Sequence, residues 1–189
     1  DEDVTRHWTG KEQGLLGVIE VDGVLYRFMG KEAPEKETPV RFEKAAVQQS
    51  VNVLPTQTYY TFKCGPVCLD LVFTSPLLLE DLDRMSTPVN YISWQVRAMD
   101  EKAHETRLTI EASPSLVVHS NDQAETVAFE EENGISYLKV GTVEQSVLAR
   151  KGDDVRIDWG YFYLAAQTEK QMEMDVSDRQ QLVYSCDMG

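Results

Sequence analysis

Residues that could carry acid–base or metal chemistry are dispersed along this chain. Its three histidines, His7, His104 and His119, lie in no H-E-x-x-H, H-x-H or H-x-D arrangement, so no local pattern predicts a zinc site. The sequence also lacks a G-x-S-x-G motif and a glycine-rich phosphate loop. We therefore predict no catalytic residue, no metal site and no cofactor in this chain.

The cysteines are too few for a disulfide scaffold, and an odd number always leaves one thiol unpaired. Cys64 and Cys68 flank a predicted three-residue turn and could face each other across it. We favour two small, half-buried apolar side chains at these positions, and a strained cross-strand disulfide is the alternative. Without further Cys or His ligands, the two thiols do not predict a metal site.

Carboxylates are abundant and occur in runs such as Glu80-Asp81-Leu82-Asp83 and Glu130-Glu131-Glu132. A glycosidase needs two carboxylates held across a cleft, and proximity in the sequence does not establish that geometry. We interpret these runs as solvated faces and Asp153-Asp154 as part of a turn.

The elements that would position these side chains are short antiparallel strands, because apolar and polar residues alternate with period two between turn residues. Three hairpins are predicted, at Leu16–Phe28 with an Asp22-Gly23 turn, at Thr56–Thr74 with a Gly65-Pro66 turn, and at Glu125–Val140 with a Glu132-Asn133-Gly134 turn. Single strands are predicted at Val89–Ala98, Glu105–Ala112 and Val155–Ala166. The predicted fold class is therefore all-β, an antiparallel β-sandwich with at most one or two short helices.

Helix signals are scarce. Ser75 followed by Pro76 predicts the start of one short helix, which would continue to Leu82, and Ser177–Leu182 could start another. The charged stretch Lys31–Thr38 predicts an exposed loop.

Composition indicates one globular domain over residues 1–189, with 42% hydrophobic residues to form its core. The 18 basic and 32 acidic residues give a net charge of −14, which disfavours nucleic acid and anionic membranes as partners. No apolar run approaches membrane-spanning length, and the opening Asp1-Glu2-Asp3 does not resemble a signal peptide.

An ordered set of short motifs runs through nearly the whole chain. It comprises Thr5-Arg6-His7-Trp8-Thr9-Gly10, Leu16-Gly17, Val21-Asp22-Gly23, Pro55-Thr56-Gln57-Thr58, Ser75-Pro76, Pro88-Val89 and Trp159-Gly160-Tyr161-Phe162-Tyr163-Leu164-Ala165. This set resembles the N-terminal domain of the glutaminase A family, large secreted proteins of fungi and bacteria. One departure is Asp100-Glu101-Lys102-Ala103-His104, where the family has a tighter Asp-Gly-Lys-x-His turn.

The resemblance implies a β-sandwich placed ahead of a helical toroid, an architecture similar to several glycoside hydrolase families. It also implies hydrolysis of L-glutamine to L-glutamate and ammonia by the whole protein, and an extracytoplasmic location, periplasmic or secreted. This chain corresponds to the sandwich and lacks the toroid, where the main cleft is expected. Its expected partners are therefore the remaining domains of the same polypeptide.

Arg6, His7 and Trp8 precede the first hairpin, outside the alternating pattern, and are the candidate interface or cleft-edge residues. In one interpretation they form an edge of the cleft or meet the missing domain. In the other, which we favour, Trp8 plugs one end of the sandwich and Arg6 pairs with a carboxylate, because Trp is usually largely buried.

Three functions remain open at this point. The first is a non-catalytic structural and docking sandwich of a glutaminase A-like hydrolase, which predicts an exposed apolar or aromatic face. The second is a carbohydrate-binding module, in which Trp8, Trp94 and Trp159 would form a row of exposed stacking platforms. The third is a self-sufficient glycosidase or amidohydrolase, which predicts a pocket with converging titratable groups.

Overall fold

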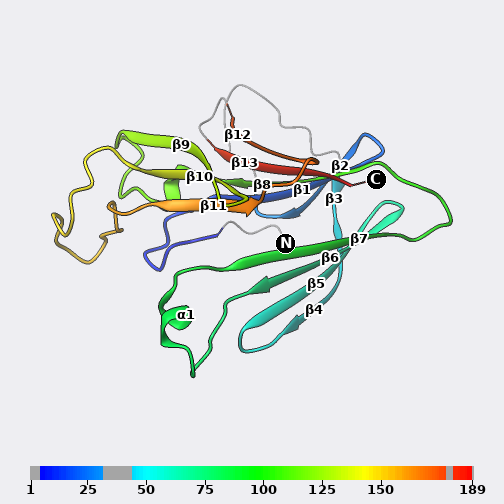
Figure 1. The fold of residues 1–189 in the computed structure, drawn as a ribbon, viewed down its shortest axis with the longest axis horizontal. Coiled ribbons are helices and arrows are strands. Elements are labelled where there is room, and N and C mark those ends of the chain that lie inside the picture. The colour runs from blue at the N-terminus through cyan, green and yellow to red at the C-terminus, as the bar shows by residue number, and fades with distance from the viewer. Residues whose placement is uncertain (1–4, 32–43, 178–180, 189) are drawn as a thin grey trace.

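A computed structural model describes residues 5–31, 44–177 and 181–188, and it is built almost entirely of β-strands (Figure 1). This confirms the predicted all-β sandwich with very little helix. The strands are β1 (Leu15–Val21), β2 (Val24–Met29), β3 (Lys44–Ala45), β4 (Val47–Val53), β5 (Gln57–Cys64), β6 (Val67–Thr74), β7 (Tyr91–Ala98), β8 (Thr106–Ala112), β9 (Glu125–Glu132), β10 (Ile135–Thr142), β11 (Phe162–Gln167), β12 (Met172–Val176) and β13 (Leu182–Met188). A short helix, α1 (Leu82–Ser86), and a 3₁₀ turn, Pro114–Leu116, join them.

The strands form three sheets. A six-stranded sheet has the order β12-β13-β8-β1-β2-β3, a four-stranded sheet the order β4-β5-β6-β7, and a three-stranded sheet the order β11-β10-β9. Only the short β2–β3 pairing is parallel among those that the structure describes. Figure 1 shows the four-stranded sheet below the six-stranded sheet, with β9–β11 to one side.

One face of the six-stranded sheet packs against both smaller sheets. On β8, Leu108 and Ile110 belong to a core shared with the four-stranded sheet, where they meet residues such as Leu69 of β6. Two residues further along the same face, Ala112 belongs to a second core with Leu138 of β10. Because alternate strand residues share a face, a single apolar face of this sheet is enough to hold both partners.

The three predicted hairpins are confirmed. Asp22-Gly23 joins β1 to β2, with φ of 48° and 81°, and Asn133-Gly134 joins β9 to β10, with φ of 52° and 76°. Two consecutive positive φ angles are what a tight type I′ turn requires, and Asn, Asp and Gly tolerate them best. Gly65-Pro66 joins β5 to β6.

The predicted strand Val155–Ala166 is wrong in its first half, because β11 begins only at Phe162. Residues 155–161 form a loop in which Arg156 and Asp158 are buried and held by side-chain hydrogen bonds. Gly160, with φ of 81°, also departs from extended geometry. The strand predictions at Val89–Ala98 and Glu105–Ala112 hold as β7 and β8, each with a slightly later start.

The first helix prediction is wrong in position. α1 begins at Leu82 rather than at Pro76, because the carboxylate of Asp81 accepts a hydrogen bond from the Arg84 amide and caps it. In the second predicted helix, residues 178–180 lie outside the described residues, as does most of the predicted loop Lys31–Thr38. Leu182 already belongs to β13, which pairs with β12 as a hairpin that the sequence analysis missed.

Replacing Gly23 tests the first hairpin. A Cβ atom at this position would meet no atom within 4 Å, so the effect of a substitution is conformational rather than steric. We expect Gly23→Val to lower the free energy of unfolding by about 1–3 kcal/mol, the usual cost of placing a non-glycine residue in left-handed backbone. Urea denaturation measures this change.

Gly23→Asn is the matched control, because Asn tolerates positive φ far better than Val does. Its loss of stability should be clearly smaller than that of Gly23→Val. Equal losses in the two variants would contradict the turn assignment.

Candidate functional site

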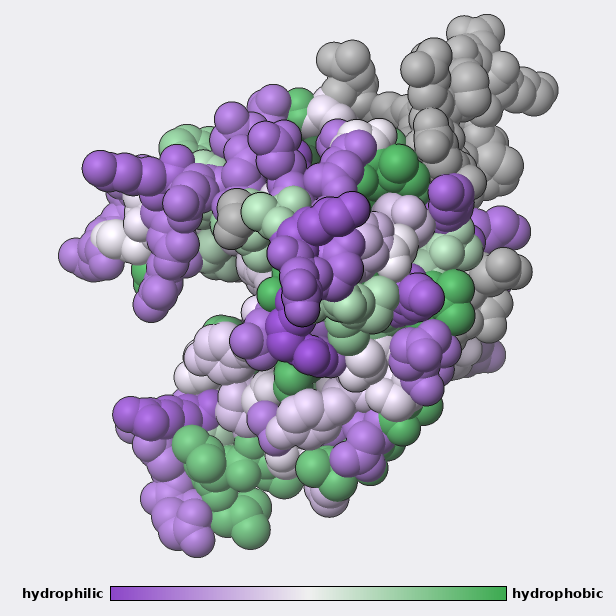
Figure 2. Space-filling model, turned by 90° about the vertical axis from the view of Figure 1, so that its right-hand side faces the viewer, coloured by the Kyte–Doolittle hydropathy of each residue, from purple (hydrophilic) through white to green (hydrophobic). Residues whose placement is uncertain are grey.

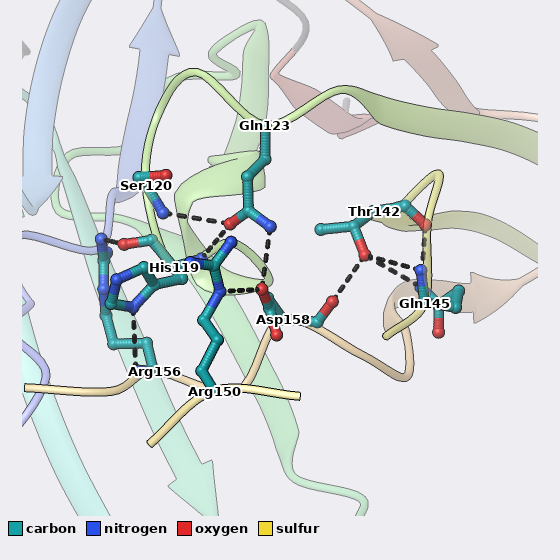
Figure 3. A network of polar contacts seen from close by, with 8 residues as sticks. All are labelled: His119, Ser120, Gln123, Thr142, Gln145, Arg150, Arg156 and Asp158. Carbon is teal, nitrogen blue, oxygen red and sulfur yellow. Dashed lines mark hydrogen bonds and ion pairs between the residues drawn. The ribbon is translucent and has the colours of Figure 1, made fainter. Parts of the chain in front are cut away.

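A cluster of polar side chains lies where the loops before and after the β9–β10 hairpin meet (Figure 3). Asp158, in the loop before β11, is only 5% exposed. One of its carboxylate oxygens, Oδ2, accepts hydrogen bonds from Arg150 Nε at 2.7 Å and from Gln123 Nε2 at 2.8 Å. The carboxylate thereby joins the β10–β11 connection, which carries Arg150 and Asp158, to the loop before β9, which carries Gln123.

A second set of hydrogen bonds fixes the backbone around Asp158. The Thr142 hydroxyl at the end of β10 donates to the Asp158 carbonyl. Gln145 accepts from the Gly160 amide at 2.7 Å and donates to the Gly160 carbonyl at 3.1 Å. Gln145 therefore bridges the two ends of the β10–β11 connection.

The ionisation of Asp158 is set by these neighbours. Burial by itself raises the pKa of Asp158, but the hydrogen bonds from Arg150 and Gln123 outweigh burial, so the pKa lies below its usual value. Asp158 is therefore a carboxylate at neutral pH and acts as an acceptor. A general acid for hydrolysis would need the opposite shift.

An open hollow of about 210 Å³ lies beside this carboxylate. Its lining is mostly polar and consists of Gln123, Thr142, Glu144, Ser146, Ala149, Arg150 and Asp158. No histidine or cysteine lines it, so the hydroxyls of Thr142 and Ser146 have no imidazole beside them to act as a base. The hollow can receive a small polar group beside Glu144, Arg150 and Asp158.

His119 and Arg156 lie next to this cluster and serve the fold. Arg156 is 6% exposed, and its guanidinium donates a hydrogen bond to the His119 carbonyl. The Arg156 amide donates a hydrogen bond to His119 Nδ1 at 3.3 Å. Within the described parts of the chain, Arg156 Nε has no hydrogen-bond partner.

His104 is clasped between two carboxylates. Its Nδ1 lies 2.6 Å from Asp22 Oδ2 and its Nε2 lies 2.8 Å from Asp100 Oδ1, and its side chain is 9% exposed. The hydrogen bonds with Asp100 and Asp22 raise the pKa of His104 above 6.5, and those with His104 lower the pKa values of both aspartates. The clasp ties the Asp22-Gly23 turn to the β7–β8 connection.

The opening motif lies apart from the Asp158 cluster. Arg6 pairs with Glu12 at 2.8 Å, which confirms the predicted pairing with a carboxylate. Trp8 is 77% exposed, so the prediction that it plugs the sandwich is wrong. A local turn, in which the Gly10 amide donates to the His7 carbonyl, holds Trp8 outward. Among the described residues, Arg6, His7 and Trp8 share no hydrogen bond or ion pair with the Asp158 cluster.

Cys64, Cys68 and Cys186 are all free and buried. Cys64 pairs with Val67 and Cys68 with Lys63 across the β5–β6 hairpin, so the two cysteine side chains lie on opposite faces of the sheet. They cannot face each other, and the disulfide alternative is wrong. Burial, followed by the charge of Cys68, raises the pKa of Cys64 to about 12, which keeps its thiol protonated and unreactive.

Two further features are absent from the part of the chain that the structure describes. No three His, Cys, Asp or Glu side chains gather as a set of metal ligands there. Within the same residues, no helix has the length and apolar character needed to cross a membrane.

The His104 clasp predicts a pH-dependent contribution to stability. Because the pKa of His104 is raised in the folded protein, its contribution to stability is complete below about pH 6.5, the pKa of an unfolded histidine. This contribution is lost as the pH rises through the pKa of His104 in the folded protein. Because the pKa values of Asp22 and Asp100 are lowered in the folded protein, their contribution to stability is complete above about pH 3.8, the pKa of an unfolded aspartate. This contribution is lost on further acidification. We therefore expect His104→Gln to lower the melting temperature most between about pH 4 and 6.5. A melting-temperature difference that stays constant from pH 5 to about pH 9 would contradict this assignment.

Thiol titration tests the burial of the cysteines. In the native protein, Ellman's reagent should react with Cys64 only on the timescale of unfolding, because a thiolate is needed and a buried thiol does not ionise. All three thiols should react in denaturant. Cys64→Ala should leave the rapid native reaction unchanged, and a rapid native signal that this variant removes would contradict the buried placement.

Comparisons with known proteins give this geometry a family context. A family model described as a domain of unknown function (DUF5127) matches residues 56–185, and another domain of unknown function (DUF4964) matches residues 1–40. The two segments share one core, to which residues 1–40 contribute Ile19 and residues 56–185 contribute Leu69. Glutaminase A of Aspergillus oryzae is 26% identical over 166 residues, which cover 86% of this chain and 22% of that protein. The chain thus spans about a fifth of the length of this relative. Because the first model matches more than half of the residues, the chain belongs to the DUF5127 family.

Proposed function

We propose that this chain is a non-catalytic docking domain of a glutaminase-like hydrolase. The observation that carries the proposal is the similarity to Glutaminase A, which extends over 86% of this chain but only 22% of that protein. A segment that makes up so small a share of an enzyme is well suited to support a catalytic part that lies elsewhere in the polypeptide. By the resemblance, that part is a helical toroid, and the parent activity is hydrolysis of L-glutamine to L-glutamate and ammonia.

The chemistry of the described residues supports a non-catalytic role. Amide hydrolysis needs an activated nucleophile or water, a general acid and an oxyanion site within hydrogen-bond reach of one another. Here Asp158 is bound to Arg150 and Gln123, and His104 is bound to two aspartates. Asp158 and His104 are thus both engaged in holding the fold together.

The aromatic residues do not favour a carbohydrate-binding module. Trp94 and Trp159 are half-buried, so Trp8 alone of the three predicted platforms is exposed. Tyr137 and Tyr163 of the three-stranded sheet lie beside Tyr161 of the loop before β11, but neighbouring rings are tilted by 62° instead of lying in one plane. Lys139 Nζ lies 4.1 Å from the centre of the Tyr161 ring. A sugar ring stacks best on a flat, open platform.

An assay of ammonia release tests the proposal. The purified chain should release no more ammonia from L-glutamine than the same chain after heat inactivation. Glutaminase A of Aspergillus oryzae, assayed in parallel at the same molar concentration, should show clear turnover. Turnover by this chain at a comparable rate would overthrow the non-catalytic assignment.

A further inference from the structure

The inner face of the four-stranded sheet extends beyond the sheet that covers it. Strand pairing places the inward side chains in rows, and in the row nearest the β5–β6 turn Cys64 and Val67 are 0% and 1% exposed. Towards the other end of the sheet, the inward side chains of β4 become exposed. There Val51, paired with Tyr60, is 48% exposed, and Val53, paired with Thr58, is 71% exposed.

The connections at this end add further apolar surface. In an antiparallel sheet the end of β4, the end of β6 and the start of β7 meet, and the Ser75 amide donates to the Thr56 carbonyl there. The β6–β7 connection carries Leu77, Leu79 and Leu82, which are 56%, 71% and 67% exposed. Helix α1 buries none of its residues. We call this surface the open end and define it by the exposed side chains of Val53, Leu54, Leu77, Leu79, Leu82 and Met85.

The pictures agree with this placement. Figure 1 puts the β4–β5 turn and the connection with α1 at the lower edge of the molecule. Figure 2, which keeps the same vertical axis, shows hydrophobic side chains gathered at the lower edge, with hydrophilic ones beside them, and a hollow between the lower and upper lobes. A contiguous apolar surface of this kind marks an interaction site more often than scattered single residues do.

We propose that the open end binds a basic amphipathic α-helix of the catalytic part to which this domain docks, a proposal that rests on the docking function above. The occupant lies against exposed side chains of the β6–β7 connection, of α1 and of the end of β4, so it gains no backbone partners from them and must satisfy its own backbone hydrogen bonds, as a helix does. Its apolar face covers the leucines. Binding of an extended strand to the β4 edge is a different mode, and the experiment below separates it.

The negative charge around the open end determines which kind of helix can bind there. Glu80, Asp81 and Asp83 alternate with the exposed leucines, and of these carboxylates only Asp81 has an ion pair within the described residues, with Arg84. The whole chain carries a net charge of −14. A second copy would bring like charges together, whereas Lys or Arg residues flanking an apolar stripe complement this rim.

A defined peptide pair tests the proposal on the intact chain. The probe is a fluorescent leucine–lysine peptide with its leucines on one helical face, and the control peptide replaces every lysine with glutamate. Fluorescence anisotropy at about 150 mM salt limits purely electrostatic attraction between distant charges. We expect the leucine–lysine peptide to bind and the leucine–glutamate peptide not to bind.

Substitutions that leave the charge unchanged locate the surface. The triple variant Leu77→Ser, Leu79→Ser and Leu82→Ser should weaken peptide binding at least about tenfold, since each leucine loses its buried contact area. Val143→Ser, Val147→Ser and Leu148→Ser form the matched control, because these residues are also exposed but lie in the β10–β11 connection. This control should bind the peptide as the parent chain does, with an unchanged melting temperature in both variants.

Three outcomes would overturn the proposal. The first is equal peptide affinity of the parent chain and the open-end variant. The second is tight binding of either control peptide. Binding of the leucine–glutamate peptide would show that the occupant need not be basic, and binding of an extended proline-containing peptide with the same residues would show that it need not be helical. The third is a dimer, measured by light scattering, that the open-end variant converts to a monomer, which would make a second copy the occupant. None of these outcomes depends on ammonia release, so this proposal and the proposed function fail separately.

Discussion

The apolar face of β1 and β8 is the packing surface on which the rest of the structure depends. Leu108 and Ile110 face the four-stranded sheet, and Ala112 on the same face meets the three-stranded sheet. Gly17 of β1 also faces this packing surface, and it must be a glycine because a Cβ atom there would lie 2.4 Å from Cε2 of the buried Phe28 ring. Phe28, a member of the core shared with the four-stranded sheet, therefore needs a residue without a side chain at position 17.

The polar clusters around Asp158 and His104 have a different structural role, which is to hold long connections against this framework. The β10–β11 connection has no strand partner of its own, so its backbone and side-chain polar groups need other acceptors and donors. Thr142, Gln145 and Asp158 supply them. The hydrogen bonds that order these loops also account for the lowered pKa of Asp158, so a shifted pKa beside a hollow can have a structural cause.

Sequence alone predicted the features that depend on neighbouring residues. Asp22-Gly23 and Asn133-Gly134 encode their turns locally, and the alternation around them sets the strands. The Asp158 cluster was missed because Gln123 lies 35 residues from Asp158, and only the folded loops bring the two together. The short alternating stretch Met172–Val176 was the available signal for β12. Trp8 was misplaced because a general preference of Trp for burial says nothing about a local turn that holds it outward.

The order of strands in the six-stranded sheet also bears on how the protein is synthesised. β1 pairs with β8, and β8 pairs with β13, so residues 15–21 find their place only beside strands that are translated much later. Such distant pairings make folding slow and leave apolar strands uncovered while the chain emerges from the ribosome. The first hairpin of the nascent protein therefore has no further strand beside β1 until β8 has been made, and β8 in turn gains its second neighbour only with Leu182–Met188.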